Sequence, residues 1–278
     1  MKKIYRILFT FILIYNFNYS WAHFGTRGGP TGGTVTCFYA DNGNNLLYFG
    51  TKTGGVYYSR NTTFTGWTYV NYIGLESPYI TAITSIGTTT TGVKMVAATP
   101  DKGLFVSSDK GITWTATYTG LANTNVTALI TKDQYIIAGT GNGEVLISSD
   151  SAKTFIKSTS QPGSKINSLI TDGNNIYAGT DNGVHISADN GLNWSVAGSG
   201  LSGQKVNALI INSGTILAGT NGGVYAATLS GINWSLTNTG LNSTTVTSFA
   251  VNGNNIYAGT NNGVFTSCLL YTSDADDN

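Results

Sequence analysis

Charge is scarce in this sequence. Charged residues make up 10% of the 278 positions, and 14 basic against 13 acidic side chains leave a formal net charge of +1. Nucleic acids and anionic membranes are held by broad positive fields, which this balance does not supply. The composition therefore argues against a polyanionic partner.

Cysteine is scarcer still. Cys37 and Cys268 are the two cysteines of the chain, so one bridge at most can form, and a disulfide framework is excluded. His185 has no cysteine or second histidine at a spacing that would share a metal ion, and no glycine-rich loop leads from a strand into a helix to cradle phosphates. We expect neither a metal ion nor a cofactor.

Long apolar runs are also missing, apart from a short one near the N-terminus. Residues 7–14 are apolar, follow three basic residues and precede Ser20-Trp21-Ala22, which is the three-part pattern of a secretory signal. The pattern predicts a signal peptide at 1–22, a flexible leader at 23–33, and a protein that is secreted or otherwise extracytoplasmic, in the periplasm or at the cell surface. Since no stretch reaches the roughly 20 apolar residues of a membrane-spanning helix, we expect no such segment in this sequence.

Glycine, by contrast, is abundant, with 36 residues, and much of it belongs to a repeat. A Gly-Thr or Ala-Thr pair recurs before each Gly-Val, Gly-Leu or equivalent pair, and its threonines are 48, 41, 40, 40 and 40 residues apart. These threonines are Thr51, Thr99, Thr140, Thr180, Thr220 and Thr260. A period near 40 with strand-like content and no helical periodicity is typical of propeller blades.

One period shows the parts of a blade. Within residues 206–235, alternating and apolar runs are separated by Asn212-Ser213-Gly214 and by Asn221-Gly222, a dipeptide favoured in two-residue hairpins. The sequence therefore predicts an all-β fold, a β-propeller at 34–266 whose four-stranded blades each take about 40 residues. Six blades are expected, and the sixth is incomplete. Their inner strands are expected to start near Val35, Ile80, Val126, Ile166, Val206 and Val246.

The repeat stops abruptly near the C-terminus. Residues 267–278 resemble a translated sequencing adapter. We therefore expect that this tail is non-native and that the chain is a fragment. The alternative is a genuine acidic tail.

Two copies of a turn motif resemble a known family. The segments Ser107–Trp114 and Ser187–Trp194 both read S-x-D-x-G-x-x-W, and are similar to the Asp-box of the BNR-repeat propellers, which include sialidases, endoglucanases, sortilin-like receptors and photosystem assembly factors. Weaker copies occur at 148–155, with Ala152 in place of glycine, and at 227–234, with Leu229 in place of aspartate. The repeat also resembles the regulator-type propellers outside bacterial sensor kinases.

The Asp-box residues are interpreted as structural. Aspartate accepts hydrogen bonds from the turn, glycine takes a conformation that other residues resist, and tryptophan packs between blades. The residues assigned this role are Ser107, Asp109, Gly111, Trp114, Ser187, Asp189, Gly191, Trp194 and Trp234. A metal site would need several converging oxygens, and each box offers one carboxylate.

The resemblance to sialidases does not extend to their chemistry. Those enzymes hold the substrate carboxylate with three arginines, whereas Arg27 and Arg60 are the arginines left after residue 22. A glycoside hydrolase would need two carboxyl groups, for which Asp101 and Asp181 are the candidates. We assign no catalytic residue.

The remaining hypothesis is a non-catalytic binding or scaffold module for a polar ligand, a carbohydrate, peptide or protein. We expect its site on the face formed by the second-to-third-strand turns and the inter-blade connections. The candidates are Tyr79, Asp101, Lys102, Asn142, Lys165, Asp181, Asn182, Lys205, Asn221 and Asn261. The alternatives are a fragment of a carbohydrate-active enzyme and a fragment of an extracytoplasmic sensor or adhesin.

Overall fold

The computed structural model describes residues 34–41, 46–59, 68–69, 73–87, 93–117, 125–241, 245–253 and 255–268. The predicted signal peptide and leader, both Arg27 and Arg60, and the tail from 269 onward lie outside these ranges. Every regular element within them is a β-strand. No helix long and apolar enough to cross a membrane occurs in these ranges.

The strands form six antiparallel sheets, five of four strands and one of three, in chain order. Blade 1 comprises β1 (Val35–Asp41), β2 (Leu46–Thr51), β3 (Val56–Ser59) and β4 (Thr68–Tyr69); blade 2 comprises β5 (Ala82–Ile86), β6 (Lys94–Thr99), β7 (Gly103–Ser107) and β8 (Thr115–Thr117); blade 3 comprises β9 (Val126–Lys132), β10 (Tyr135–Thr140), β11 (Val145–Ser148) and β12 (Ile156–Lys157). Blade 4 comprises β13 (Ile166–Thr171), β14 (Ile176–Thr180), β15 (Gly183–Ser187) and β16 (Ser195–Val196); blade 5 comprises β17 (Val206–Asn212), β18 (Thr215–Thr220), β19 (Gly223–Thr228) and β20 (Gly231–Leu236); blade 6 comprises β21 (Val246–Asn252), β22 (Asn255–Thr260) and β23 (Gly263–Cys268).

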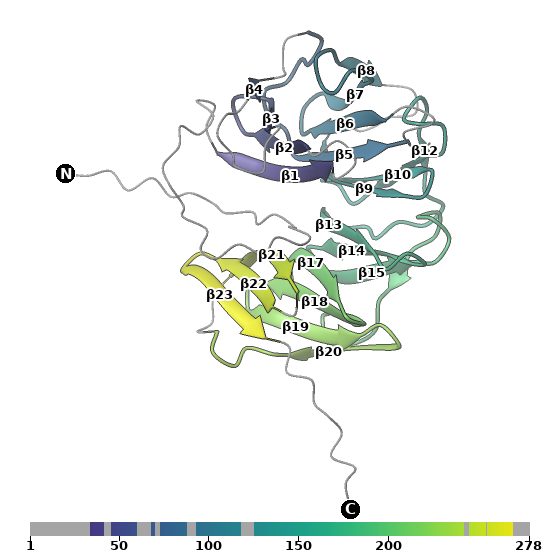
Figure 1. Cartoon of the computed structure of the whole chain (residues 1–278). Coiled ribbons are helices and arrows are strands. Elements are labelled where there is room, and N and C mark those ends of the chain that lie inside the picture. The colour runs from purple at the N-terminus through teal and green to yellow at the C-terminus, as the bar shows by residue number, and fades with distance from the viewer. Residues whose placement is uncertain are drawn as a thin grey trace, which may run out of the picture.

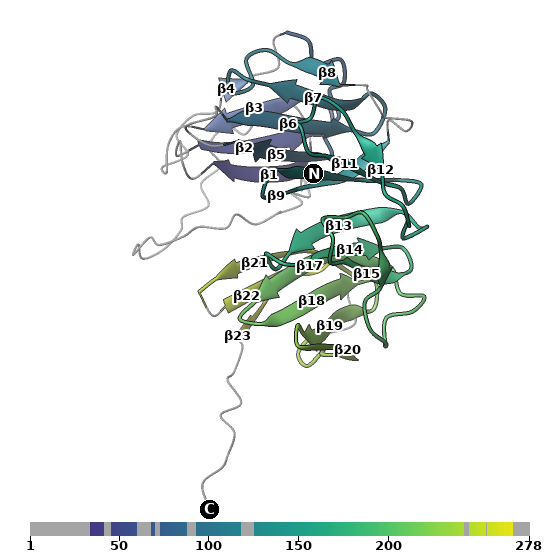
Figure 2. The same ribbon diagram turned by 90° about the vertical axis from the view of Figure 1, so that its right-hand side faces the viewer.

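These sheets make a six-bladed β-propeller whose sixth blade has three strands, as the repeat predicts. Figures 1 and 2 show the blades following one another in chain order around an arc, from the purple first blade to the yellow sixth. The inner strands contact each other in the same order, from β1 on β5 through to β17 on β21.

Two boundaries differ from the sequence expectation. The second inner strand begins at Ala82, because the N–H of Ile80 bonds the Thr51 carbonyl of blade 1 at 2.9 Å instead of joining its own ladder. The last strand runs through Cys268, which is paired with Asn255, and so extends two residues beyond the expected border at 266.

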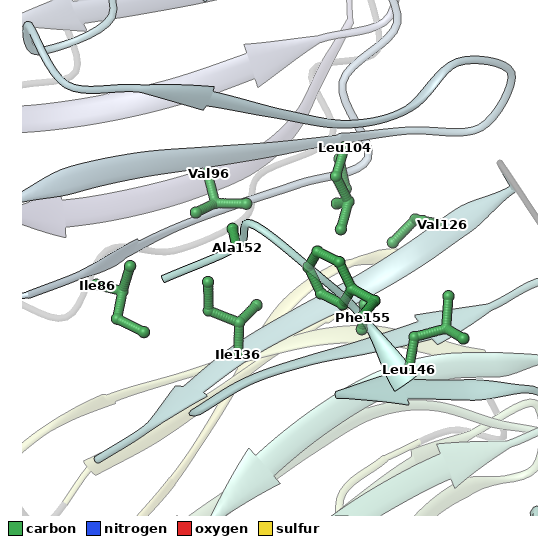
Figure 3. Close-up of a cluster of buried hydrophobic side chains, with 10 residues drawn as sticks. Ile86, Val96, Leu104, Val126, Ile136, Leu146, Ala152 and Phe155 are labelled. Atoms are coloured by element: carbon green, nitrogen blue, oxygen red, sulfur yellow. The ribbon is translucent and has the colours of Figure 1, made fainter. Parts of the chain in front are cut away.

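The core is divided into clusters that lie between consecutive blades. Because side chains alternate along a strand, each sheet buries one face against the blade before it and the other against the blade after it. Figure 3 shows the cluster between blades 2 and 3, where Val96 and Leu104 point toward Ile136 and Phe155. Burial on both faces explains why the second strands read as continuous apolar runs, such as Ile136–Ala138.

Candidate functional site

Strand direction defines two faces of the ring. In each blade, the start of the inner strand, the end of the second strand and the start of the third lie together; Ile166 pairs with Thr180, which pairs with Gly183. We call this end the top face, and it carries the second-to-third-strand turns. The bottom face carries the first turns and the Asp-boxes, so every candidate ligand residue lies on the opposite face from the boxes.

The repeated threonine fixes each top turn. Its hydroxyl accepts a hydrogen bond from a turn N–H and donates one to the carbonyl that begins the third strand. In blade 5, Gly222 N–H lies 3.0 Å from Thr220 Oγ1, which lies 3.0 Å from the Gly223 carbonyl oxygen. The same pair of bonds is made by Thr51, Thr99, Thr140, Thr180 and Thr260. The residue that reveals the repeat therefore has a structural role.

A second repeated contact joins neighbouring blades. The second residue of each of the first five periods donates a side-chain hydrogen bond to the carbonyl of the first residue of the next period. These inter-blade rungs are Thr36 to Ile80, Thr81 to Val126 at 2.6 Å, Thr127 to Ile166 at 2.6 Å, Asn167 to Val206 at 3.0 Å and Asn207 to Val246 at 3.0 Å. The sequence analysis missed them, although a threonine or asparagine recurs at this position in every period.

The two asparagine rungs also reach the top turns. Asn167 Nδ2 donates to Asp181 Oδ1 at 2.8 Å, and Asn207 Nδ2 donates to Asn221 Oδ1 at 3.0 Å. Lys205 Nζ lies 3.7 Å from the same Asp181 oxygen, with both side chains about 40% exposed.

The connection after blade 4 is also bonded to a top turn. Asn182 Oδ1 accepts the Gly203 N–H at 2.9 Å. Blades 4 and 5 thus carry three hydrogen-bonded groups of polar side chains at the top face. Together they are called the polar row, which consists of Asn167, Asp181, Asn182, Lys205, Asn207 and Asn221.

A smaller polar group lies on blades 1 and 2. Ser77 Oγ donates to Asp101 Oδ1 at 2.7 Å and accepts the Tyr79 N–H at 3.3 Å. Lys52 Nζ lies 5.9 Å from the centre of the half-buried Tyr79 ring, within cation–π range. Lys102 is exposed beside Asp101.

The other candidates do not join either group. The Asn142 side chain donates to Glu144 within its own turn at 3.1 Å. Lys165 and Asn261 are exposed, and their backbone atoms form hydrogen bonds. Asp101 and Asp181 lie on blades 2 and 4, with blade 3 between them, and each has its own partners. The structure does not bring them together as a carboxylate pair.

On the bottom face, the Asp-boxes are closed hydrogen-bonded turns. Asp189 Oδ1 accepts the Ser187 hydroxyl and the Asn193 N–H, both at 2.8 Å, while Ser187 Oγ accepts the Gly191 N–H at 2.9 Å. Gly191 has φ +90°, which L side chains resist. The first box repeats this network through Ser107, Asp109 and Gly111.

The box carboxylates are held in their charged form. Desolvation alone would raise the pKa of Asp150, but hydrogen bonds from Thr154, Ser148 and Lys153 outweigh it and lower the pKa to about 2. The pKa values of Asp109 and Asp189 are lowered by the same balance. Within the described ranges, no group of three or more ligating side chains could hold a metal ion.

The box tryptophans tie each blade to the one before it. The backbone N–H of Trp194 bonds Ser160 Oγ at 2.7 Å and that of Trp234 bonds the Ser199 carbonyl at 2.9 Å, both in the connection leaving the preceding blade. Trp114 does the same with the Ile73 carbonyl at 2.8 Å. The box in blade 5 lacks aspartate, and a tight hairpin through Leu229 replaces the turn, yet Trp234 keeps its place.

No known protein family matches the chain, so the Asp-box relationship stays a resemblance of motif. No curated protein matches it either. Among solved structures, the fold is similar to the extracellular domain of BT3049 from B. thetaiotaomicron, assigned to the hybrid two-component systems, with TM-score 0.70 and 18% identity over 89% of this chain and 35% of that one. The corresponding domain of BT4673 gives 0.68 and 20% over 88% and 33%.

A Niastella koreensis GH74 enzyme is also similar, with TM-score 0.59 and 17% identity over 82% of this chain and 41% of that one. The chain therefore spans about a third of the sensor domains and less than half of the enzyme. Since 1252 solved chains match, and those named here are at most 20% identical, the likeness establishes the propeller and does not select a function.

Proposed function

We propose that the chain is a non-catalytic binding propeller that acts outside the cytoplasm and holds a polar ligand, a glycan or a peptide, on its top face. The polar row carries this proposal. Asn167 and Asn207 are oriented by bonds to backbone carbonyls of the next blade and in turn donate to Asp181 and Asn221, so that less side-chain entropy is lost when a ligand replaces water.

Two features support the location outside the cytoplasm. The predicted signal at 1–22 directs export. The fold is also similar to the extracellular domains of two B. thetaiotaomicron two-component systems, which supports a place outside the cytoplasm.

The test compares the two faces. A variant with Asp181→Ala, Asn182→Ala and Lys205→Ala should lose at least tenfold in affinity for a glycan or peptide that the native protein selects from an array. The matched control is Asp133→Ala with Lys153→Ala, two exposed charges on the bottom face, and it should bind like the native protein. Equal losses from both variants would show that the top face is not the site.

A glycoside hydrolase is the weaker candidate, favoured by the similarity to the GH74 enzyme. Two carboxyl groups would have to flank one bond within about 10 Å, and Asp101 and Asp181 instead lie on blades separated by a third. We expect no release of reducing sugar from polysaccharides. Measured release that disappears in Asp101→Asn or Asp181→Asn would favour the hydrolase.

A further inference from the structure

The first turn of blade 6 is nearly identical in sequence to the first turn of blade 4. It begins with Val251 and Asn252, where blade 4 has Thr171 and Asp172, and the eight residues that follow are the same in both blades. The two turns also join their strands in the same register. Blade 4 therefore shows what each of the two changes alters in blade 6.

The first change concerns a carboxylate that collects the donors of its turn. Asp172 Oδ1 accepts the N–H groups of Asn174 at 2.8 Å and Asn175 at 2.6 Å, and Oδ2 accepts the Tyr177 hydroxyl at 2.9 Å. Although desolvation alone would raise it, these bonds lower the pKa of Asp172 below its ordinary value. The Asn252 side chain makes no hydrogen bond with the described residues.

The second change concerns a backbone N–H. In blade 4, Thr171 Oγ1 accepts the N–H of Gly173 at 3.0 Å. Val251 has no hydroxyl group, and within the described part of the chain the N–H of Gly253 has no hydrogen-bond partner. Asn252 and Gly253 are both exposed.

Four other Asn-Gly pairs differ from this one, because the N–H of each glycine is held by an oxygen. Gly143 donates to the Thr140 carbonyl at 3.2 Å, Gly183 to the Gln204 carbonyl at 2.8 Å, Gly191 to Ser187 Oγ at 2.9 Å and Gly222 to Thr220 Oγ1 at 3.0 Å. The asparagines of these pairs are Asn142, Asn182, Asn190 and Asn221.

We propose that Asn252 is a site of self-modification, at which the asparagine deamidates without an enzyme. The Gly253 nitrogen gives up its proton and bonds to Cγ of Asn252, and the Cγ–Nδ2 bond breaks as ammonia leaves. Water then opens the cyclic imide, at Cγ to give aspartate or at the main-chain carbonyl to give isoaspartate. The net change is the gain of one water and the loss of one ammonia. Glycine favours ring closure because it has no Cβ in the way, and a hydrogen bond that holds its N–H opposes it.

The aspartate product gives blade 6 the turn that blade 4 already has. Asn255 and Tyr257 are the counterparts of Asn175 and Tyr177, so the new carboxylate meets the same kinds of donor. It also adds a negative charge to residues 206–268, which have no charged side chain. The site lies on the bottom face and is independent of the proposed function.

The test follows the full chain during incubation at mildly alkaline pH. Peptide mapping by mass spectrometry measures conversion at each Asn-Gly pair, counting aspartate and isoaspartate together. Asn252 should convert at least tenfold faster than Asn182 and Asn221 in the folded protein, and at a similar rate to them in urea. Similar rates at the three positions in the folded protein would overturn the proposal.

Variants exchange the features of the two turns. Val251→Thr should slow conversion at Asn252 at least fivefold, because its hydroxyl can hold the Gly253 N–H. In blade 4, Asp172→Asn should convert at least fivefold more slowly than Asp172→Asn combined with Thr171→Val. Thermal melts show that each variant is folded. An unchanged rate in Val251→Thr, or equal rates in the two blade 4 variants, would contradict the role of the N–H.

Asn252→Asp tests the product directly. Its thermal midpoint at neutral pH should be higher than that of the native protein, whereas Asn252→Ser, which removes the amide without adding a carboxylate, should give no increase. A midpoint for Asn252→Asp no higher than the native one, or an equal rise in Asn252→Ser, would show that the carboxylate does not bind the donors of this turn.

Discussion

At the scale of single residues, the aspartate and the tryptophan of an Asp-box stabilise the fold in different ways. The carboxylate of Asp189 lies in an exposed turn where water can replace some of its bonds. The indole of Trp194 is buried between blades and donates Nε1–H to the Gly191 carbonyl at 2.8 Å. The two residues of one motif therefore contribute unequally to stability.

The first prediction follows from this difference. Trp194→Ala should lower the free energy of unfolding by about 3–5 kcal/mol, since it leaves a cavity between blades 3 and 4. Asp189→Ala should cost about 1 kcal/mol, because the turn donors regain water. Denaturant unfolding measures both, with Lys153→Ala, at an exposed position of the turn in blade 3, as the control. A larger loss of stability for Asp189→Ala than for Trp194→Ala would show that the turn, and not the indole, makes the larger contribution.

His185 gives a prediction about pH. The side chain is 8% exposed, its Nδ1 has no hydrogen-bond partner among the described residues, and desolvation lowers its pKa below the ordinary 6.5. As pH falls through about 6.5 the unfolded chain takes up a proton that the folded chain resists, so stability falls with it. The aromatic residues Tyr57, Phe105 and Tyr225 occupy this position in other blades.

His185→Phe should therefore reduce the loss of stability between pH 7 and pH 5. Thermal midpoints of variant and native protein across this range measure the effect. The same slope in both proteins would mean that His185 is not the group responsible.

At the scale of the strand and the blade, the inter-blade rungs are hydrogen bonds that each repeat donates to the next one. Each one satisfies the first carbonyl of the next blade, so the inner strands are fixed in register by a side chain from outside their own sheet. Backbone carbonyls of this kind are costly to leave without a donor.

Removing one rung tests this role. Asn167→Ala removes bonds to the Val206 carbonyl and to Asp181, and should cost about 1–2 kcal/mol. Asn167→Thr should recover part of the loss, because threonine makes the rung in blades 1 to 3. Denaturant unfolding of the native protein and the two variants measures this contribution. Equal stability of all three would show that the rung does not stabilise the fold.

The sequence predicted the blades well because glycine-rich turns and the repeated threonine recur at a fixed period. It also predicted the top and bottom faces. Consecutive antiparallel strands place the first and third turns of a blade at one end and the second turn at the other. The rungs escaped prediction because their donor changes between threonine and asparagine and their acceptor is a backbone atom about forty residues away. The hairpin at Leu229 was not predicted, because Trp234 stands at its usual place in the motif although the turn before it is different.

At the scale of the whole molecule, close approach between blades sets the shape of the ring. A Cβ on Gly219 would lie 2.6 Å from Val246 Cγ1 and 3.0 Å from Phe249 Cε2 of the next inner strand. Gly139 and Gly179 meet Ile166 and Val206 in the same way. These glycines let each inner strand pack directly on the second strand of the blade before it.

The last prediction concerns this approach. Gly219→Ala should destabilise the protein by about 1–3 kcal/mol, because blades 5 and 6 must separate to admit the methyl group. Gly231→Ala is the control, since a Cβ there meets nothing within 4 Å. Thermal unfolding of the two variants measures the difference, and an unchanged midpoint for Gly219→Ala would show that the ring adjusts freely.

The rungs all point the same way along the chain, from each blade to its successor. Every blade between the first and the last therefore contributes a donor to one neighbour and an acceptor to the other. An in-frame duplication of the codons for residues 206–245 would add a blade that already carries both halves of its two new contacts. In this architecture, a gain of one unit by unequal recombination needs no new interface to evolve.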